Sequence, residues 1–206
     1  GTSLANASLT CPLKPLPPWY MNVRNSMVLL EDSRSLGSGF HVTGSKSELR
    51  LVTAAHVFSA ESQEIDFSPR IFHAYKGLNW KPSSRYSLVS FKVSPGLFDR
   101  GNDIIQTPVA TNDSKPIEVI AEFNVPMPGQ RFHIAGFPGG SRDNFHMYDC
   151  TFAGFDRAFA RESDQVSYVL SCPAVPGSIE GMSGGPLLDD FGRVWGVISE
   201  HSVIIS

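Results

Sequence analysis

Glycine and proline interrupt this chain at short intervals along its whole length, and this limits it to short elements of structure. The 206 residues include 18 glycines and 15 prolines, and no long segment repeats apolar residues with the 3.6-residue period of an amphipathic helix. Between the turn residues lie short apolar runs, a pattern that is typical of β-strands. About a dozen such runs in two groups predict an all-β protein of two packed antiparallel β-barrels.

The two groups of predicted strands lie on either side of a polar linker at residues 111–116, which ends in proline. We predict an N-terminal extension at 1–19, a first β-barrel at 20–115 and a second β-barrel with a short carboxyl end at 116–206. The extension is assigned because prolines crowd residues 11–18 and exclude a helix there. A single helical turn is expected at 54–59. The predicted strands are 27–30, 37–42, 49–53, 71–75, 88–93, 104–109, 118–121, 131–136, 147–154, 166–171, 185–188 and 194–199.

The composition is that of an ordinary globular protein and implies no unusual partner. Hydrophobic residues make up 41% and charged residues 18% of the chain, with a formal net charge of −3. Without a basic stripe we expect no nucleic acid partner, and no apolar run reaches the length of about 20 residues that spans a bilayer. The first residues lack the charged and apolar regions of a signal peptide. The location stays open, with a secreted or exported one favoured.

Three cysteines allow three disulfide pairings, each of which leaves one thiol over. We predict a bond between Cys150 and Cys172 because both lie on strands expected in the second barrel, whereas Cys11 lies in the extension. Free thiols or another pairing remain alternatives. The histidines outside the motifs considered next show no metal-ligand spacing, so we expect no metal and no cofactor. These histidines are His41, His73, His133 and His146.

The strongest chemical signal is the run Gly-Met-Ser-Gly-Gly-Pro at residues 181–186. A nucleophilic serine needs an exposed hydroxyl and backbone N–H groups directed at the place where an oxyanion forms. Glycines on both sides of Ser183 supply the required backbone freedom. We therefore predict Ser183 as nucleophile, with the N–H groups of Gly181 and Ser183 as oxyanion hole. The alternative is a glycine-rich hairpin turn.

A second signal is the histidine in Leu-Val-Thr-Ala-Ala-His-Val at residues 51–57. An apolar strand runs there into two alanines, whose small size lets the chain turn and leaves the imidazole at the barrel rim. We predict His56 as general base. Taken alone, the motif fits a histidine at the end of a strand better than a general base, and the serine run reverses this preference.

A third signal is the acid in Gly-Asn-Asp-Ile-Ile at residues 101–105. An acid that opens an apolar strand is held half-buried, where it fixes a histidine tautomer and stabilises the imidazolium. We predict Asp103 in this role. A turn that caps the strand is the alternative, and Asp99 is the competing acid, although no Ile-Ile run follows it.

These three motifs, in this order, resemble those of the chymotrypsin-like (trypsin-fold) serine peptidases. The resemblance rests on Thr-Ala-Ala-His at 53–56, Asn-Asp-Ile at 102–104 and the serine run at 181–186. It implies a serine endopeptidase that acts on protein or peptide substrates at a cleft between the two barrels. It also implies that Ser183 attacks the carbonyl, His56 moves the proton and water hydrolyses the acyl-enzyme.

The chain departs from the digestive trypsins of that family in its activation. In those enzymes a freed amino terminus pairs with an acid just before the serine, and here Met182 stands at that position. We therefore expect a site that forms without a freed amino terminus, held by packing of Met182 against the second barrel. In this respect the chain resembles the bacterial exported, HtrA-like or viral branches more than the digestive trypsins.

The resemblance also indicates where substrate side chains bind. The pocket floor corresponds to Gly177 and Ser178, and the absence of an aspartate there argues against cleavage after lysine or arginine. The pocket wall corresponds to residues 195–201, including Ser199 and His201, which should bind the substrate backbone as an added strand. Ser178 and His201 would suit a carboxylate, but His201 fits a plain strand-end residue better, so a neutral or small apolar preference is expected.

Two other functions fit the same motifs. One is a catalytically silent relative that uses the protease surface to bind a protein, although the complete set of three catalytic residues and both glycines argues against it. The other is a self-processing protease of viral type, which a short carboxyl end would suit.

Overall fold

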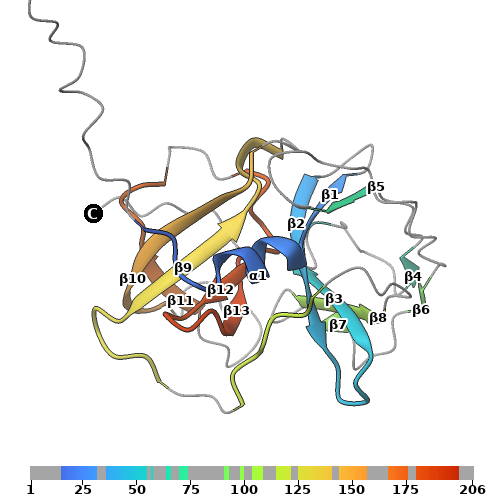
Figure 1. Ribbon diagram of the computed structural model, residues 1–206, viewed down its shortest axis with the longest axis horizontal. Helices are drawn as coiled ribbons and strands as arrows, with labels where there is room; N and C mark the ends of the chain where they lie inside the picture. Colours follow the sequence, from blue (N-terminus) through green and yellow to red (C-terminus); the bar gives the residue numbers. More distant parts are fainter. Residues whose placement is uncertain are drawn as a thin grey trace, which may run out of the picture.

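The computed structural model (Figure 1) describes residues 15–31, 36–54, 57, 64–65, 70–73, 91–92, 98–99, 104–108, 115–121, 125–140, 144–156, 167–175 and 180–199. Its strands form two antiparallel sheets and one short ribbon. One helix, α1 (Tyr20–Ser26), lies between the two sheets in the view of Figure 1. The all-β architecture of two antiparallel sheets confirms the predicted double-barrel class.

The first sheet contains six strands in the order β5-β1-β2-β3-β8-β7. Beside it, β4 (Glu64–Ile65) and β6 (Phe91–Lys92) form the two-stranded ribbon. Strands β4 and β7 were not among the predicted strands, and both are only two residues long. The strands of the first sheet are β1 (Met27–Glu31), β2 (Leu36–Thr43), β3 (Leu49–Ala54), β5 (Arg70–His73), β7 (Phe98–Asp99) and β8 (Ile104–Pro108).

The second sheet contains five strands in the order β11-β10-β9-β12-β13. The long strand β10 is paired with both β9 and β11, and a bulge lies between Phe152 and Gly154. The sheet occupies the left of Figure 1, and the first sheet occupies the right. Its strands are β9 (Arg131–Gly136), β10 (His146–Asp156), β11 (Ser167–Ser171), β12 (Pro186–Leu188) and β13 (Val194–Val197).

Buried apolar side chains form two core clusters, one of which is shared by both sheets. The shared cluster consists of Val23, Met27, Leu29, Phe40, Val42, Val52, Ile117, Ala135, Phe137, Leu188 and Val194. The other lies within the second sheet and consists of Phe132, Ile134, Cys150, Phe152, Met182 and Leu187. Removal of this apolar surface from water is the main force that holds the sheets together.

The segment at 115–121 connects the two sheets through its backbone. The N–H of Ile117 donates to the carbonyl of His41 in the first sheet at 2.8 Å. Two residues later, Val119 forms an isolated parallel bridge with Val194 in the second sheet. The prediction of a strand at 118–121 is therefore wrong. The segment divides its hydrogen bonds between the two sheets instead of pairing along one of them.

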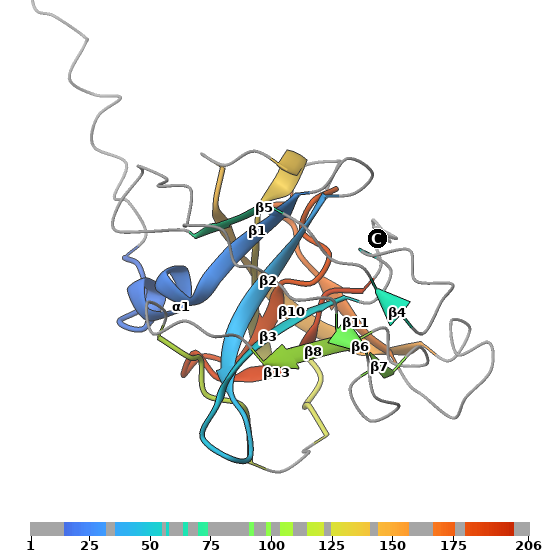
Figure 2. The same cartoon turned by 90° about the vertical axis from the view of Figure 1, so that its right-hand side faces the viewer.

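Helix α1 was not expected from the sequence. Its N-cap residue, Trp19, makes no side-chain capping hydrogen bond, so the sequence lacks the usual signal for the start of a helix. The helix is held by tertiary contacts, since Val23 is fully buried and the indole N–H of Trp19 donates to the Asp190 carbonyl at 2.8 Å. Turned by 90°, Figure 2 shows α1 beside the start of β1. Among the described residues, no helix is long and apolar enough to span a membrane.

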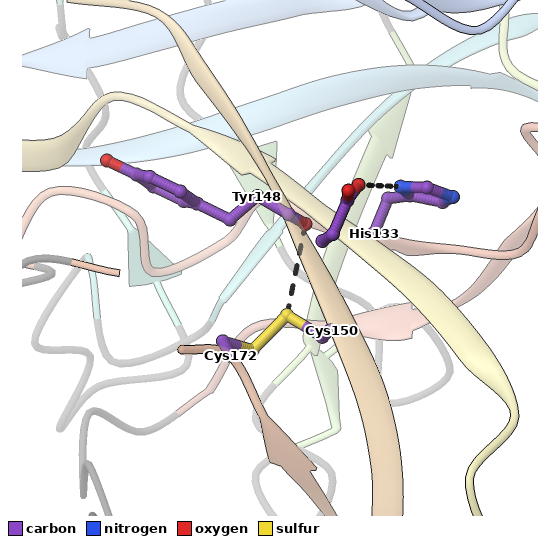
Figure 3. The surroundings of a disulfide bond; sticks show 5 residues. His133, Tyr148, Cys150 and Cys172 are labelled. Atoms are coloured by element: carbon purple, nitrogen blue, oxygen red, sulfur yellow. Dashed lines mark hydrogen bonds and ion pairs between the residues drawn. A yellow bond between two sulfur atoms is a disulfide. The ribbon is translucent and has the colours of Figure 1, made fainter. Parts of the chain in front are cut away.

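A disulfide joins Cys150 on β10 to Cys172, which directly follows β11 (Figure 3). The two Cα atoms are 4.3 Å apart, so the bond predicted from the sequence is present. The same figure shows His133 on β9. Its ring nitrogens each lie 2.8 Å from a carboxylate oxygen, one of Asp149 and one of Asp190.

Candidate active site

The loop that carries Ser183 requires glycine at two positions. Gly181 has φ +94° and Gly184 has φ +90°, in the left-handed region that side chains with a Cβ rarely adopt. A Cβ at Gly181 would also contact the Phe137 carbonyl and lie 2.6 Å from the Gly140 N atom. The loop therefore uses the backbone freedom expected from its glycines, and it is packed against a 3₁₀ turn, η3 (Pro138–Gly140).

All four carbonyls of residues 180–183 accept hydrogen bonds. The donors, in order along the loop, are Gly139 N at 2.6 Å, Ser38 Oγ at 2.7 Å, Gly185 N at 3.0 Å and Ser38 N at 2.8 Å. A trans peptide points its N–H group away from its carbonyl, and none of the described peptide bonds is cis. The fixed carbonyls of Glu180 and Met182 therefore also fix the directions of the Gly181 and Ser183 N–H groups.

Met182 packs into the second sheet and has no exposed surface. Its neighbours in that core cluster include Phe132 and Ile134 of β9. The packing of Met182 against the second barrel, expected from the sequence, is therefore present.

The serine loop rests against the first sheet. Ser38 on β2 donates its N–H to the Ser183 carbonyl, and a Cβ at Gly184 would contact the Ser38 carbonyl, the Thr53 hydroxyl and, at 2.9 Å, the Ala54 N atom. A Cβ at Gly37 would lie 2.6 Å from a Val57 methyl group and 3.2 Å from the Ser183 carbonyl. The serine loop thus packs against the beginning of β2 and the end of β3.

Ser183 is more buried than the sequence predicted. The residue is only 2% exposed, whereas an exposed hydroxyl was expected. The reason is its position, because the loop lies between the two sheets and β2 covers its backbone.

Of the predicted site residues, the structure describes Gly181, Ser183 and Ser199. The segment before Ser199 is joined to the serine loop, since Gly184 N donates to the Ile198 carbonyl and Ile198 N donates to the Gly185 carbonyl, both at 2.8 Å. The serine loop and the predicted pocket wall are therefore adjacent. The remaining candidates lie outside the described residues, and they are His56, Asp103, Gly177, Ser178 and His201.

The described neighbours of His56 and Asp103 belong to paired strands. Ala54, at the end of β3, is the register partner of Ile104, at the start of β8. His56 comes two residues after Ala54 and Asp103 directly precedes Ile104. On its other side, Ile104 is the register partner of the competing acid, Asp99.

Strand β13, which carries part of the predicted pocket wall, is fixed by a buried carboxylate. Asp189 accepts hydrogen bonds from the Trp195 indole at 2.8 Å and from the Arg193 guanidinium at 2.9 Å. Burial by itself would raise the pKa of Asp189, but these bonds and those from the Arg193 and Phe191 N–H groups outweigh it and lower the pKa. The Trp195 ring also packs edge-on against Phe132, with 5.3 Å between centroids.

Sequence reasoning missed Ser38, which contacts the serine loop at two carbonyls. Its signal was Gly-Ser-Gly within an apolar strand at residues 37–39, because glycine inside a strand often marks close approach of another backbone. The approach of residues 137–140 to the serine loop was also missed. Among the residues that the structure describes, no group of three possible metal ligands is present.

Residues 37–197 match the family model described as a trypsin-like peptidase domain. The chain belongs to the trypsin-like peptidase family. The match extends from the glycine before Ser38 to the end of β13, so it includes the serine loop, the second sheet and the first sheet apart from β1 and the first residue of β2. No curated protein matches the sequence significantly.

Solved structures show the fold of this trypsin-like peptidase in other proteins. Deg5 has a TM-score of 0.60 at 20% identity, over 88% of this chain and 82% of Deg5. The Rv3671c protease from M. tuberculosis, in its active form, has a TM-score of 0.58 at 19% identity, over 93% and 83%. The MamO protease domain from Magnetospirillum magneticum has a TM-score of 0.53 at 16% identity, over 86% and 85%.

Proposed function

We propose that this trypsin-like peptidase is a serine endopeptidase in which Ser183 is the nucleophile, His56 the general base and Asp103 the orienting acid. The observation that carries the proposal is that the serine loop packs against the end of β3. A Cβ at Gly184 would lie 2.9 Å from the Ala54 N atom, and Ala54 is paired with Ile104. His56 follows Ala54 by two residues, and Asp103 directly precedes Ile104.

In the proposed reaction, the Ser183 hydroxyl attacks the carbonyl carbon of a peptide while His56 takes its proton. The oxyanion that forms is stabilised by the N–H groups of Gly181 and Ser183, whose directions are fixed by the bonded carbonyls. The C–N bond then breaks as His56 returns the proton to the leaving amine. Water, deprotonated by His56, hydrolyses the acyl-enzyme and restores the serine.

We propose that the substrate lies beside the segment that follows β13. Ile198 is bonded to the serine loop, so a peptide that binds along Ser199 and His201 would have its backbone close to Ser183. Gly177 and Ser178 would form the pocket floor, which favours a neutral or small apolar residue before the cleaved bond.

Labelling with a fluorophosphonate probe tests the proposal without knowledge of the substrate. The wild-type protein should be labelled at Ser183, and Ser183→Ala should not be labelled. Because this change removes only one oxygen, the variant should keep its fold. A wild-type protein that is folded but not labelled would contradict the proposal and favour a protein-binding module without activity.

The acid is tested by a matched pair of variants. Asp103→Asn should lower turnover by about 10⁴, because an amide favours the wrong imidazole tautomer. Asp99→Asn serves as control, since Asp99 is the competing acid beside Ile104. A larger loss from Asp99→Asn than from Asp103→Asn would contradict the assignment of Asp103.

A further inference from the structure

The hydroxyl of Ser38 joins two loops of the second sheet from a strand of the first. It donates to the Gly181 carbonyl at 2.7 Å and accepts from the Phe137 N–H at 3.0 Å. Ser38 and Phe137 have no exposed surface, so water does not replace either bond. A serine hydroxyl has one donor and two acceptor sites, and both kinds are used here.

The bond to Gly181 holds the central peptide of the serine loop. The two proposed oxyanion donors, Gly181 N–H and Ser183 N–H, belong to the peptides on either side of it. The orientation of this central peptide therefore determines how the two donors are placed relative to each other. Gly181 lacks a Cβ and has φ +94°, so its own rotational preference does little to resist a flip of the peptide.

We propose that Ser38 is a positioning residue for the oxyanion hole, acting through the Gly181 carbonyl. This inference rests on the proposed function of Ser183. Without the hydroxyl, the Gly181 carbonyl loses a donor and the Phe137 N–H loses an acceptor. The central peptide is then free to rotate, and only the bonds to the Glu180 and Met182 carbonyls hold the two N–H groups, so their placement relative to each other is no longer set.

Ser26, the last residue of α1, provides a matched control that is bonded to the same strand, β2. It is also fully buried, and its hydroxyl also donates to a backbone carbonyl and accepts from a backbone N–H, both of His41, at 2.9 and 3.1 Å. Ser26→Ala therefore removes the same two kinds of hydrogen bond as Ser38→Ala. Only the Ser38 change affects the serine loop.

The experiment measures the kinetics of fluorophosphonate labelling for wild type, Ser38→Ala and Ser26→Ala. Loss of one oxyanion donor costs about 10² to 10³ in rate, so Ser38→Ala should lower the maximal labelling rate about 100-fold. The concentration of probe at half-maximal rate should stay within about threefold, because the effect is in the transition state. Ser26→Ala should lose a similar amount of thermal stability but label at the wild-type rate.

The possible outcomes distinguish the role of Ser38 from the proposed function of Ser183. Equal labelling rates for wild type and Ser38→Ala would overturn the role of Ser38 and leave the proposed function intact. An equal loss of rate in Ser26→Ala would show a merely structural effect and would also overturn it. A folded wild type without labelling would overturn the proposed function itself.

If Ser38→Ala fails to fold, Ser38→Cys provides the test. This variant keeps the shape of the side chain and replaces the hydroxyl with a weak donor. We expect Ser38→Cys to have a maximal labelling rate below that of wild type, but by less than about 100-fold. A wild-type rate for folded Ser38→Cys would refute the role of the hydroxyl.

Discussion

Substitution of Gly184 by alanine should destabilise the protein strongly, because two separate costs add at this position. Gly184 has φ +90°, and a left-handed conformation costs a residue with a Cβ about 1–2 kcal/mol. The new Cβ would also meet the Ser38 carbonyl, the Thr53 hydroxyl and the Ala54 N atom. Overpacking of this kind costs about 1–3 kcal/mol. The expected loss in the free energy of unfolding is therefore about 2–5 kcal/mol.

Two other glycines separate these costs. Gly129 has φ +75° but a Cβ there would meet no atom within 4 Å, so Gly129→Ala should show the backbone cost alone. Gly196 has neither problem, since the nearest atom to its Cβ would be Leu187 Cδ2 at 3.9 Å. Gly196→Ala should therefore change the free energy of unfolding by less than about 1 kcal/mol.

Urea denaturation of the three variants measures these differences directly. The order of loss should be Gly184→Ala, then Gly129→Ala, then Gly196→Ala. Labelling of Ser183 should also fall in Gly184→Ala, because the loop must move away from β3 to accommodate the methyl group. A loss in Gly184→Ala no larger than that in Gly129→Ala would refute the contact of the serine loop with the first sheet.

Three further predictions concern the second sheet and the activation of the site. Cys172→Ser should lower the free energy of unfolding by about 3 kcal/mol, as expected for a bond that closes a loop with a sequence separation of 22; Cys11→Ser, measured in the same chemical denaturation, should not. Asp189→Asn should lower the free energy of unfolding by about 1–3 kcal/mol at pH 7. Because the folded-state pKa of Asp189 is lowered, this difference should be full above about pH 4 and shrink as the pH falls further, which unfolding curves of both proteins would reveal. Extra residues before Gly1 should leave fluorophosphonate labelling of Ser183 unchanged, whereas labelling that appears only after their removal would indicate a switch at the amino terminus.

Strands of the core were predictable because each carries its own apolar pattern. The prediction of 131–136 has the bounds of β9, and those of 27–30 and 49–53 differ from β1 and β3 by one residue. Helix α1 was missed because its seven residues have no capping side chain and depend on burial of Val23. The local sequence carries no signal for a tertiary contact of that kind.

The candidate site was predictable only where a motif is local. The glycines at 181 and 184 indicated backbone angles closed to other residues, and both have positive φ. The glycines beside Ser38 indicate a close backbone approach but not its partner, since the hydroxyl partners of Ser38 lie 143 and 99 residues away in the chain. The burial of Ser183 was missed for the same reason, because it results from the approach of β2.

The core cluster shared by the two sheets has a consequence for how the protein unfolds. Met27 and Phe40 of the first sheet pack in the same cluster as Ala135 and Leu188 of the second, so neither sheet can expose its own apolar face while the other stays folded. The two halves should melt in a single calorimetric transition, with equal calorimetric and van't Hoff enthalpies. The same coupling opposes a hinge motion between them, so in the proposed reaction a peptide would bind as an extended chain without any opening of one half from the other.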